Sequence, residues 1–159
     1  MFKYLRTGMG LEQDIKQKKF KDEYSKAIVN LIFTNNWLNE KQNKVFKPYG
    51  LTVAQFNVLR ILRGQYPNPV TVNLIIERML DRMSNASRIV DKLEKKGLVI
   101  RKQCESDRRA VDVIISDEGL DLLTQLDKDL YNWQDSVKSL TDEECEQLNH
   151  LLDKFRLSN

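Results

Sequence analysis

The segment 104–113, Cys-Glu-Ser-Asp-Arg-Arg-Ala-Val-Asp-Val, contains two adjacent arginines, a residue type that binds anions. Asp107 is followed directly by Arg108 and Arg109, and runs rich in valine and isoleucine flank these charged residues. An arginine guanidinium is weakly hydrated and is attracted to phosphate groups and to narrow, strongly negative grooves. A neighbouring carboxylate can orient it through an ion pair. The pattern favours binding to a polyanion, and the alternative is a charged hairpin tip that only faces solvent.

The sequence lacks the motifs that catalysis commonly uses. It has no G-x-S-x-G, no G-x-x-x-x-G-K-[ST] and no H-E-x-x-H. Cys104 and Cys145 lie far apart and have only His150 as an imidazole companion, so neither a zinc site nor a disulfide framework is predicted. We therefore expect no enzyme, no metal and no cofactor, with reduced cysteines that act as small apolar side chains.

Cys104 also allows an alternative interpretation. Arg101 and Lys102 are close to it in sequence, and nearby positive charge favours a reactive thiolate. Redox sensing through Cys104 therefore stays open beside its role as an apolar filler. Treatment with peroxide or diamide, compared between the wild type and Cys104→Ser, separates the two interpretations.

Charge is graded along the chain. The 159 residues include 26 basic and 23 acidic side chains, for a net charge of +3. Residues 1–70 carry a net charge of +7, residues 71–109 carry +4 and residues 110–159 carry −8. A basic front suits a polyanionic partner, with solvated charged helices as the alternative. The length suits a single subunit, and the lack of a long apolar run or a signal peptide predicts a cytoplasmic protein.

The elements that must position these residues are predicted from hydrophobic periodicity. Residues 11–46 repeat apolar side chains at steps of three and four, which is typical of one long amphipathic helix. Thr52 and Gln55 form a capping box for a helix that ends near residue 63. Asn73 is a plausible N-cap for a short helix that follows.

The C-terminal half combines a hairpin with two further helices. Residues 98–104 and 110–116 are rich in valine and isoleucine and predict two strands, with Val111 and Val113 packed on the core. Ser116 is placed to cap the next helix, and Thr141-Asp142-Glu143-Glu144 forms a capping box for the last one.

A short helix is predicted over residues 84–97, with Ser84 as N-cap and Gly97 as the C-terminal stop. Its apolar face consists of Ala86, Ile89, Val90 and Leu93. Its outer face is polar and basic and consists of Asn85, Arg88, Lys92 and Lys95. Two short helices followed by a two-stranded hairpin indicate a winged helix-turn-helix, in which the second helix enters the DNA major groove.

Residues 51–119 resemble the MarR family of bacterial transcription regulators. Residues 107–111 (D-R-R-A-V) and 114–119 (I-I-S-D-E-G) are similar to the family's D-R-R, hydrophobic strand and T/S-x-x-G helix start. Leu51-Thr52 with Gln55-Phe56, and the run from Arg88 to Val99, add to the resemblance. The turn Leu80-Asp81-Arg82-Met83 differs from the glycine-containing turn that is common in the family.

The resemblance implies a mainly α fold with a small β-wing in one subunit spanning 1–159. Residues 51–116 would form the winged helix-turn-helix lobe, and residues 11–46 and 120–157 the dimerisation helices. It also implies an obligate homodimer, in the typical case a repressor. Such a dimer binds pseudo-palindromic duplex DNA with half-sites about 34–36 Å apart. A small aromatic or anionic effector would release it.

The predicted DNA contacts come from the short helix and the wing. Asn85 and Arg88 are the first candidates for base edges, because Asn pairs with adenine and Arg with guanine. The other candidates, for bases, phosphates or the minor groove, are Ser84, Ser87, Lys92, Arg108 and Arg109, and Asp107 is expected to orient one of the two arginines through a salt bridge. An ordinary solvated helix face is the alternative for the helix residues.

A set of aromatic side chains is the candidate effector pocket, although aromatic residues at helical spacing are more often core. The set consists of Phe33, Trp37, Phe46, Tyr49 and Phe56. A winged-helix module that binds protein instead of DNA is the remaining alternative, and it would lack exposed Arg and Lys on its recognition face.

Overall fold

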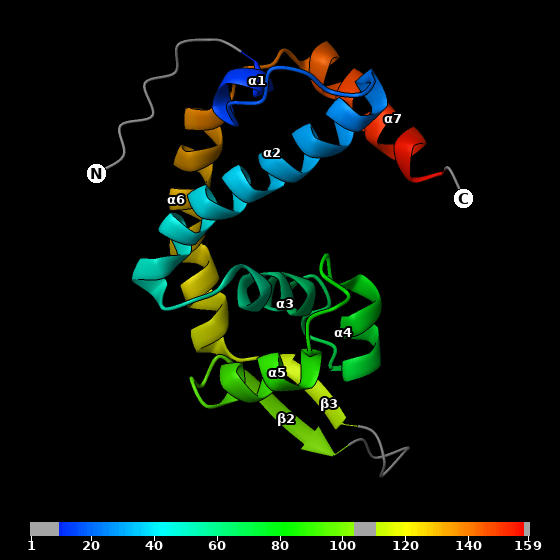
Figure 1. The fold of residues 1–159 in the computed structure, drawn as a ribbon. Helices are drawn as coiled ribbons and strands as arrows, with labels where there is room; N and C mark the ends of the chain where they lie inside the picture. The colour runs from blue at the N-terminus through cyan, green and yellow to red at the C-terminus, as the bar shows by residue number, and fades with distance from the viewer. Residues whose placement is uncertain (1–9, 104–110, 158–159) are drawn as a thin grey trace. The chain divides into compact units, whose positions relative to one another are not determined.

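The structure is a computed structural model that describes residues 10–103 and 111–157. The described chain is mostly helical with one small antiparallel sheet, as predicted (Figure 1). Its elements are α1 (Leu11–Asp14), α2 (Glu23–Phe46), the 3-10 helix η1 (Lys47–Tyr49), α3 (Val53–Arg63), β1 (Val70–Thr71), α4 (Val72–Arg78), α5 (Ala86–Glu94), β2 (Val99–Gln103), β3 (Val111–Ile115), α6 (Asp117–Val137) and α7 (Asp142–Arg156). The chain divides into two compact units between Phe56 and Asn57, inside α3.

In the N-terminal unit, the single helix predicted over residues 11–46 is wrong. The first helix ends at Asp14, and α2 begins at Glu23 after a connection in which Lys16 has a φ of 54°. Asp22 is the reason for the new start, because its Oδ1 accepts the Ser25 backbone N–H at 2.7 Å. Aspartate is a strong N-cap, and this cap outweighs the continuing helical pattern.

The end of the N-terminal unit confirms the predicted capping box. Thr52 Oγ1 accepts the Gln55 N–H at 3.2 Å, and Gln55 Oε1 accepts the Thr52 N–H at 3.1 Å. Phe46 is fully buried and stacks on Phe56 with ring centroids 4.6 Å apart. These bonds and this stack hold the start of α3 in place.

In the C-terminal unit, three strands form a sheet in the order β1-β3-β2. Val113 pairs with Val70 on one side, and Ile115 pairs with Val99 on the other. Val113 is fully buried, as predicted, but Val111 is 37% exposed, so its predicted core contact is wrong. Val111 is the first residue of β3 and pairs with Gln103, the last residue of β2, so it lies at the end of the strand pairing.

The helices of this unit pack around a shared apolar core. Its fully buried side chains include Leu59, Leu62, Ile75, Val90, Leu93 and Leu123. The short helix α4 is capped by Thr71, whose Oγ1 accepts the Leu74 N–H at 3.3 Å, so the N-cap predicted at Asn73 is wrong. Both residue types are good caps, and the chain is still extended at Thr71 when it leaves the sheet.

The start of α6 is built against the wing. Ser116 caps the helix as predicted, and its hydroxyl also donates to the Gly97 carbonyl at 2.7 Å. Gly119 approaches the Leu98 carbonyl so closely that an added Cβ would lie 2.3 Å from the oxygen. Farther along α6, Asp127 accepts hydrogen bonds from Arg63 at 2.7 Å and Arg60 at 3.2 Å, which tie α6 to α3.

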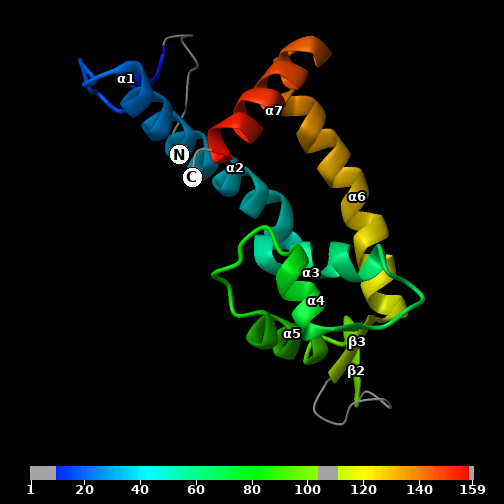
Figure 2. The ribbon, with the colours of Figure 1, turned by 90° about the vertical axis from the view of Figure 1, so that its right-hand side faces the viewer.

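The last helix carries the predicted capping box at Thr141 and Glu144. None of its residues is fully buried, and Leu148 and Leu151 are exposed. Figure 2 shows α7 turning back sharply from the end of α6. No helix in the described part of the chain is long and apolar enough to cross a membrane.

Candidate nucleic-acid interface

Helix α5 presents the polar and basic face that the sequence predicted. Ala86, Val90 and Leu93 are buried on its inner side. The predicted contact residues Asn85, Ser87, Arg88 and Lys92 are exposed, and Ser84 is partly buried. The helix lies beside β2 (Figures 1 and 2), so the wing supports one side of it.

The N-cap of α5 is Asn85, so the cap predicted at Ser84 is wrong. Asn85 Oδ1 accepts the Arg88 backbone N–H at 3.0 Å. Ser84 instead donates its hydroxyl to Asp81 Oδ2 at 2.5 Å. The cap therefore occupies Asn85 Oδ1, and the amide nitrogen is the group of this side chain that remains for a base acceptor.

The turn before α5 is organised by Asp81 in place of a glycine. Asp81 Oδ1 accepts the Met83 N–H at 3.0 Å, and Asn57 Oδ1 accepts the Leu80 N–H at 3.0 Å. The hydrogen bonds from Ser84 and Met83 lower the pKa of Asp81 below its ordinary 3.8. Because the folded pKa is lowered, this stabilisation is present above the ordinary value and is lost as the pH falls through the lowered one.

Arg101 on β2 is a residue that sequence reasoning missed. Its Nη2 lies 2.6 Å from Asp91 Oδ1 and donates to the Ser87 carbonyl at 3.2 Å, and its Nε lies 3.6 Å from Glu94 Oε2. Arg101 therefore joins the wing to α5 and offsets two acidic charges of that helix. The only sign of this role in the sequence was that Asp91 and Glu94 lie three residues apart on an otherwise basic helix and so need a basic partner.

Replacing Arg101 with methionine should destabilise the wing and α5 together. The variant loses the ion pairs of Arg101 with Asp91 and Glu94 and leaves these two carboxylates on the helix without their partner, a cost of about 1–2 kcal/mol. Thermal unfolding followed by circular dichroism should show a melting temperature lower by about 2–8 °C. Arg156→Met is the matched control, because Arg156 pairs with Asp153 on the exposed surface of α7. Equal melting temperatures for the two variants would show that Arg101 does not hold the wing.

The predicted wing contacts Asp107, Arg108 and Arg109 lie outside the described residues, as does Cys104. Strand β2 ends at Gln103, directly before this segment, and β3 begins at Val111, directly after it. Gln103 and Val111 pair with each other. The remaining cysteine, Cys145, is an exposed free thiol on α7. Among the described residues, no three His, Cys, Asp or Glu side chains are placed to hold a metal ion.

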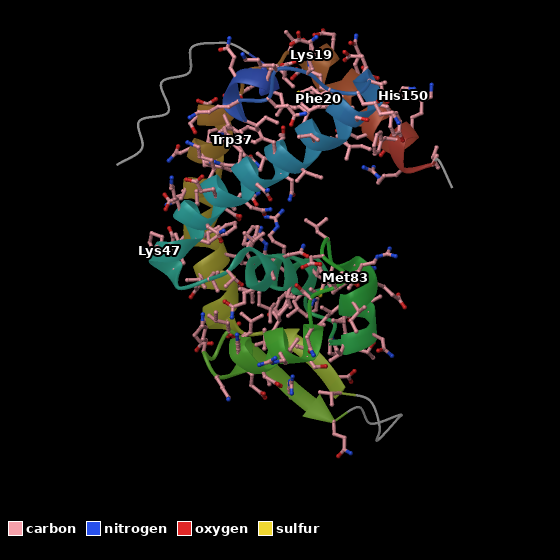
Figure 3. All side chains as sticks on the ribbon, viewed as in Figure 1. Lys19, Phe20, Trp37, Lys47, Met83 and His150 are labelled. Carbon is pink, nitrogen blue, oxygen red and sulfur yellow. The ribbon has the colours of Figure 1, made fainter. Side chains whose placement is uncertain are left out.

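The aromatic set is only partly brought together. Phe46 and Phe56 form the stack described above, and Phe33 and Tyr49 are partly buried. Trp37 lies on α2 (Figure 3), with Lys41 Nζ 5.8 Å from the centroid of its ring. The stack therefore has a structural role, and Trp37 has a cation beside it.

Comparison with known proteins identifies the chain's relatives. The model of the MarR family matches residues 51–111. The transcriptional regulator MgrA of Staphylococcus aureus is 33% identical over 115 residues, which cover 70% of this chain and 74% of MgrA. The chain belongs to the MarR family. MhqR of Bacillus subtilis, also a transcriptional regulator of the MarR type, is 30% identical over 76% of this chain and 83% of its own length.

A solved structure supports the fold over nearly the whole chain. The organohalide-sensing regulator RdhR-CbdbA1625, solved in its 2,4-dichlorophenol-bound form, aligns with a TM-score of 0.76 at 20% identity. The alignment covers 98% of this chain and 88% of that one. As a MarR-family member with regulators as relatives, this protein is a DNA-binding transcriptional regulator and not an enzyme. The motif 107–119, the strands and the α5 pattern thus supported a correct identification.

Proposed function

We propose that this protein is a homodimeric repressor that binds a pseudo-palindromic duplex and is released by a small molecule. The observation that carries the proposal is the exposed basic face of α5, whose opposite face is buried and whose side is held to the wing by Arg101. In a helix-turn-helix, such a face enters the major groove. A protein-binding module would not need Arg88 and Lys92 exposed there.

In this proposal some side chains of α5 contact bases and others contact phosphates. Arg88 bonds a guanine through two hydrogen bonds, and Asn85 donates its amide N–H to a base acceptor. Ser87 and Lys92 contact phosphates and set the register. Ser84 instead supports the turn before α5, because its hydroxyl hydrogen is donated to Asp81. The sequence predicted that Asn85 would pair with adenine through two hydrogen bonds. We now assign it only the bond that its amide N–H donates, because its oxygen caps the helix.

The wing is proposed to reach the adjacent minor groove with Arg108 and Arg109, which Asp107 orients. Arg108→Ala and Arg109→Ala should each weaken binding by about tenfold per half-site, the value expected for one charge-assisted hydrogen bond, and so by about a hundredfold in the proposed dimer. Fluorescence anisotropy on a bound duplex measures the loss, and light scattering should show unchanged assembly. Unchanged affinity in both variants would remove the wing from the interface.

The dimer is proposed to form through the helices within residues 11–46 and 120–157, with residues 51–116 as the DNA-binding lobe. Support comes from apolar side chains that each unit leaves exposed. These are Tyr24, Ile28 and Ile32 on α2, and Leu148 and Leu151 on α7. A second copy would remove this apolar surface from water.

The effector is proposed to be a small aromatic or anionic molecule near the set Phe33, Trp37, Phe46, Tyr49 and Phe56. The cation beside Trp37 and the phenol bound to RdhR-CbdbA1625 support this class of ligand. Such a molecule releases DNA only if it binds the DNA-incompetent conformation more tightly. Redox control through Cys104 is the alternative trigger, and Cys104→Ser removes it.

Selection from a random duplex pool tests the proposed function. The bound sequences should converge on an inverted repeat whose half-sites are about 10 base pairs apart from centre to centre. Convergence on a single asymmetric half-site would contradict the dimer, and no convergence would contradict specific binding.

A further inference from the structure

The turn between α4 and α5 exposes an apolar side chain close to the start of α5. Met83 is 95% exposed, the highest value for a large hydrophobic side chain among the described residues. Figure 3 shows it at this turn, and it lies two residues before Asn85, the N-cap of α5. The core does not use this side chain, so nearly all of its apolar surface faces solvent.

The position of Met83 is held by its neighbours. Its own N–H is bonded to Asp81 Oδ1 at 3.0 Å, and the next residue, Ser84, bonds the other oxygen of the same carboxylate at 2.5 Å. Asn57 bonds the backbone at Leu80, the other end of the turn. The backbone that carries Met83 is therefore tied to the start of α5.

We infer that Met83 recognises thymine by packing on its C5-methyl group in the major groove. This inference rests on the proposed function, since it requires α5 to lie in that groove with its N-terminal end at the bases. Thymine's methyl is the apolar group of the major-groove edges, and an apolar side chain is what reads it. The residues that follow, Asn85 and Arg88, supply hydrogen bonds and cannot make this contact. Methionine is unbranched and adapts its shape to such a surface.

The test removes the methyl group and the side chain independently. Each thymine of the selected duplex is replaced in turn by deoxyuridine, which lacks only the C5-methyl, and the dissociation constant is measured by anisotropy. For the wild type, one thymine per half-site should show a penalty of about fourfold, or about 15-fold when both half-sites are changed. Met83→Ala and Met83→Gln remove the contact from both subunits, so each should weaken binding to the thymine duplex by about 15-fold. Replacing that thymine with deoxyuridine should then weaken the binding of these variants no further.

Leu80→Ala is the matched control, because Leu80 lies on the same turn and is 88% exposed. It should keep the full deoxyuridine penalty. The inference is overturned if the Met83 variants keep that penalty, if Leu80→Ala abolishes it, or if no thymine shows one. In those cases the selected duplex still binds specifically, so the proposed function stands. A selection that yields no specific duplex would overturn both.

Discussion

Replacing Arg88 with alanine should strongly weaken sequence-specific binding by this regulator while leaving it folded. A two-bond contact from arginine to guanine contributes about 1–3 kcal/mol. The proposed dimer presents Arg88 twice, so affinity for the selected duplex should fall by at least roughly 30-fold. The fold should survive, because Arg88 is exposed and its backbone N–H keeps the bond to Asn85. Anisotropy titrations of the selected duplex measure the effect.

Lys92→Ala is the matched control on the same face of α5. It removes the same charge as Arg88→Ala. Because Lys92 is proposed to contact a phosphate, its loss should weaken binding to the selected and the random duplex alike. The slope of log affinity against log salt concentration should become shallower by about one per subunit. Arg88→Ala should instead lose preference at one base pair of each half-site. If Arg88→Ala retains both the affinity and the base preference of the wild type, α5 does not recognise bases through this residue.

The second large effect is expected on stability, from Gly119→Ala. The new Cβ would lie 2.3 Å from the Leu98 carbonyl oxygen and 2.7 Å from Ile115 Cγ1. The carbonyl belongs to the backbone and cannot rotate away, so α6 or the wing must shift. We expect a loss on the order of 3 kcal/mol in the free energy of unfolding, and a melting temperature about 6–12 °C lower for a chain of this size.

Gly64→Ala is the control for this glycine. An added Cβ there would lie 3.5 Å from its nearest neighbours, which is ordinary contact, so stability should change by less than about 0.5 kcal/mol. Thermal melts of both variants beside the wild type make the comparison. A Gly119→Ala protein as stable as Gly64→Ala would show that the packing of α6 on the wing is looser than the structure has it.

The parts of the fold that local patterns specify were predictable. The buried face of α5 follows a helical repeat, and Val113 lies on the buried side of its strand because alternation specifies it. The capping boxes at Thr52 and Thr141 are local signals as well. The family motif in residues 107–119 then supplied the topology.

The wrong or missing predictions concern places where two residues could cap the same helix, or where a contact between residues far apart in sequence determines the structure. Ser84 and Asn85 are both good caps, and the bond from Ser84 to Asp81 left the cap to Asn85. The helical repeat over residues 11–46 gave no warning of the stronger cap at Asp22. Arg101 could not be recognised from its neighbours in sequence, because its role depends on contacts with Ser87, Asp91 and Glu94 across the fold.

Specific duplex binding by α5 and the wing is tested most directly by one comparison. The affinity of the wild-type protein is measured for the selected duplex and for a random duplex of equal length across a salt series. Both affinities should fall as salt rises, with the selected duplex bound roughly a thousandfold more tightly or better at physiological salt. Equal affinities for the two duplexes throughout the series would contradict the account.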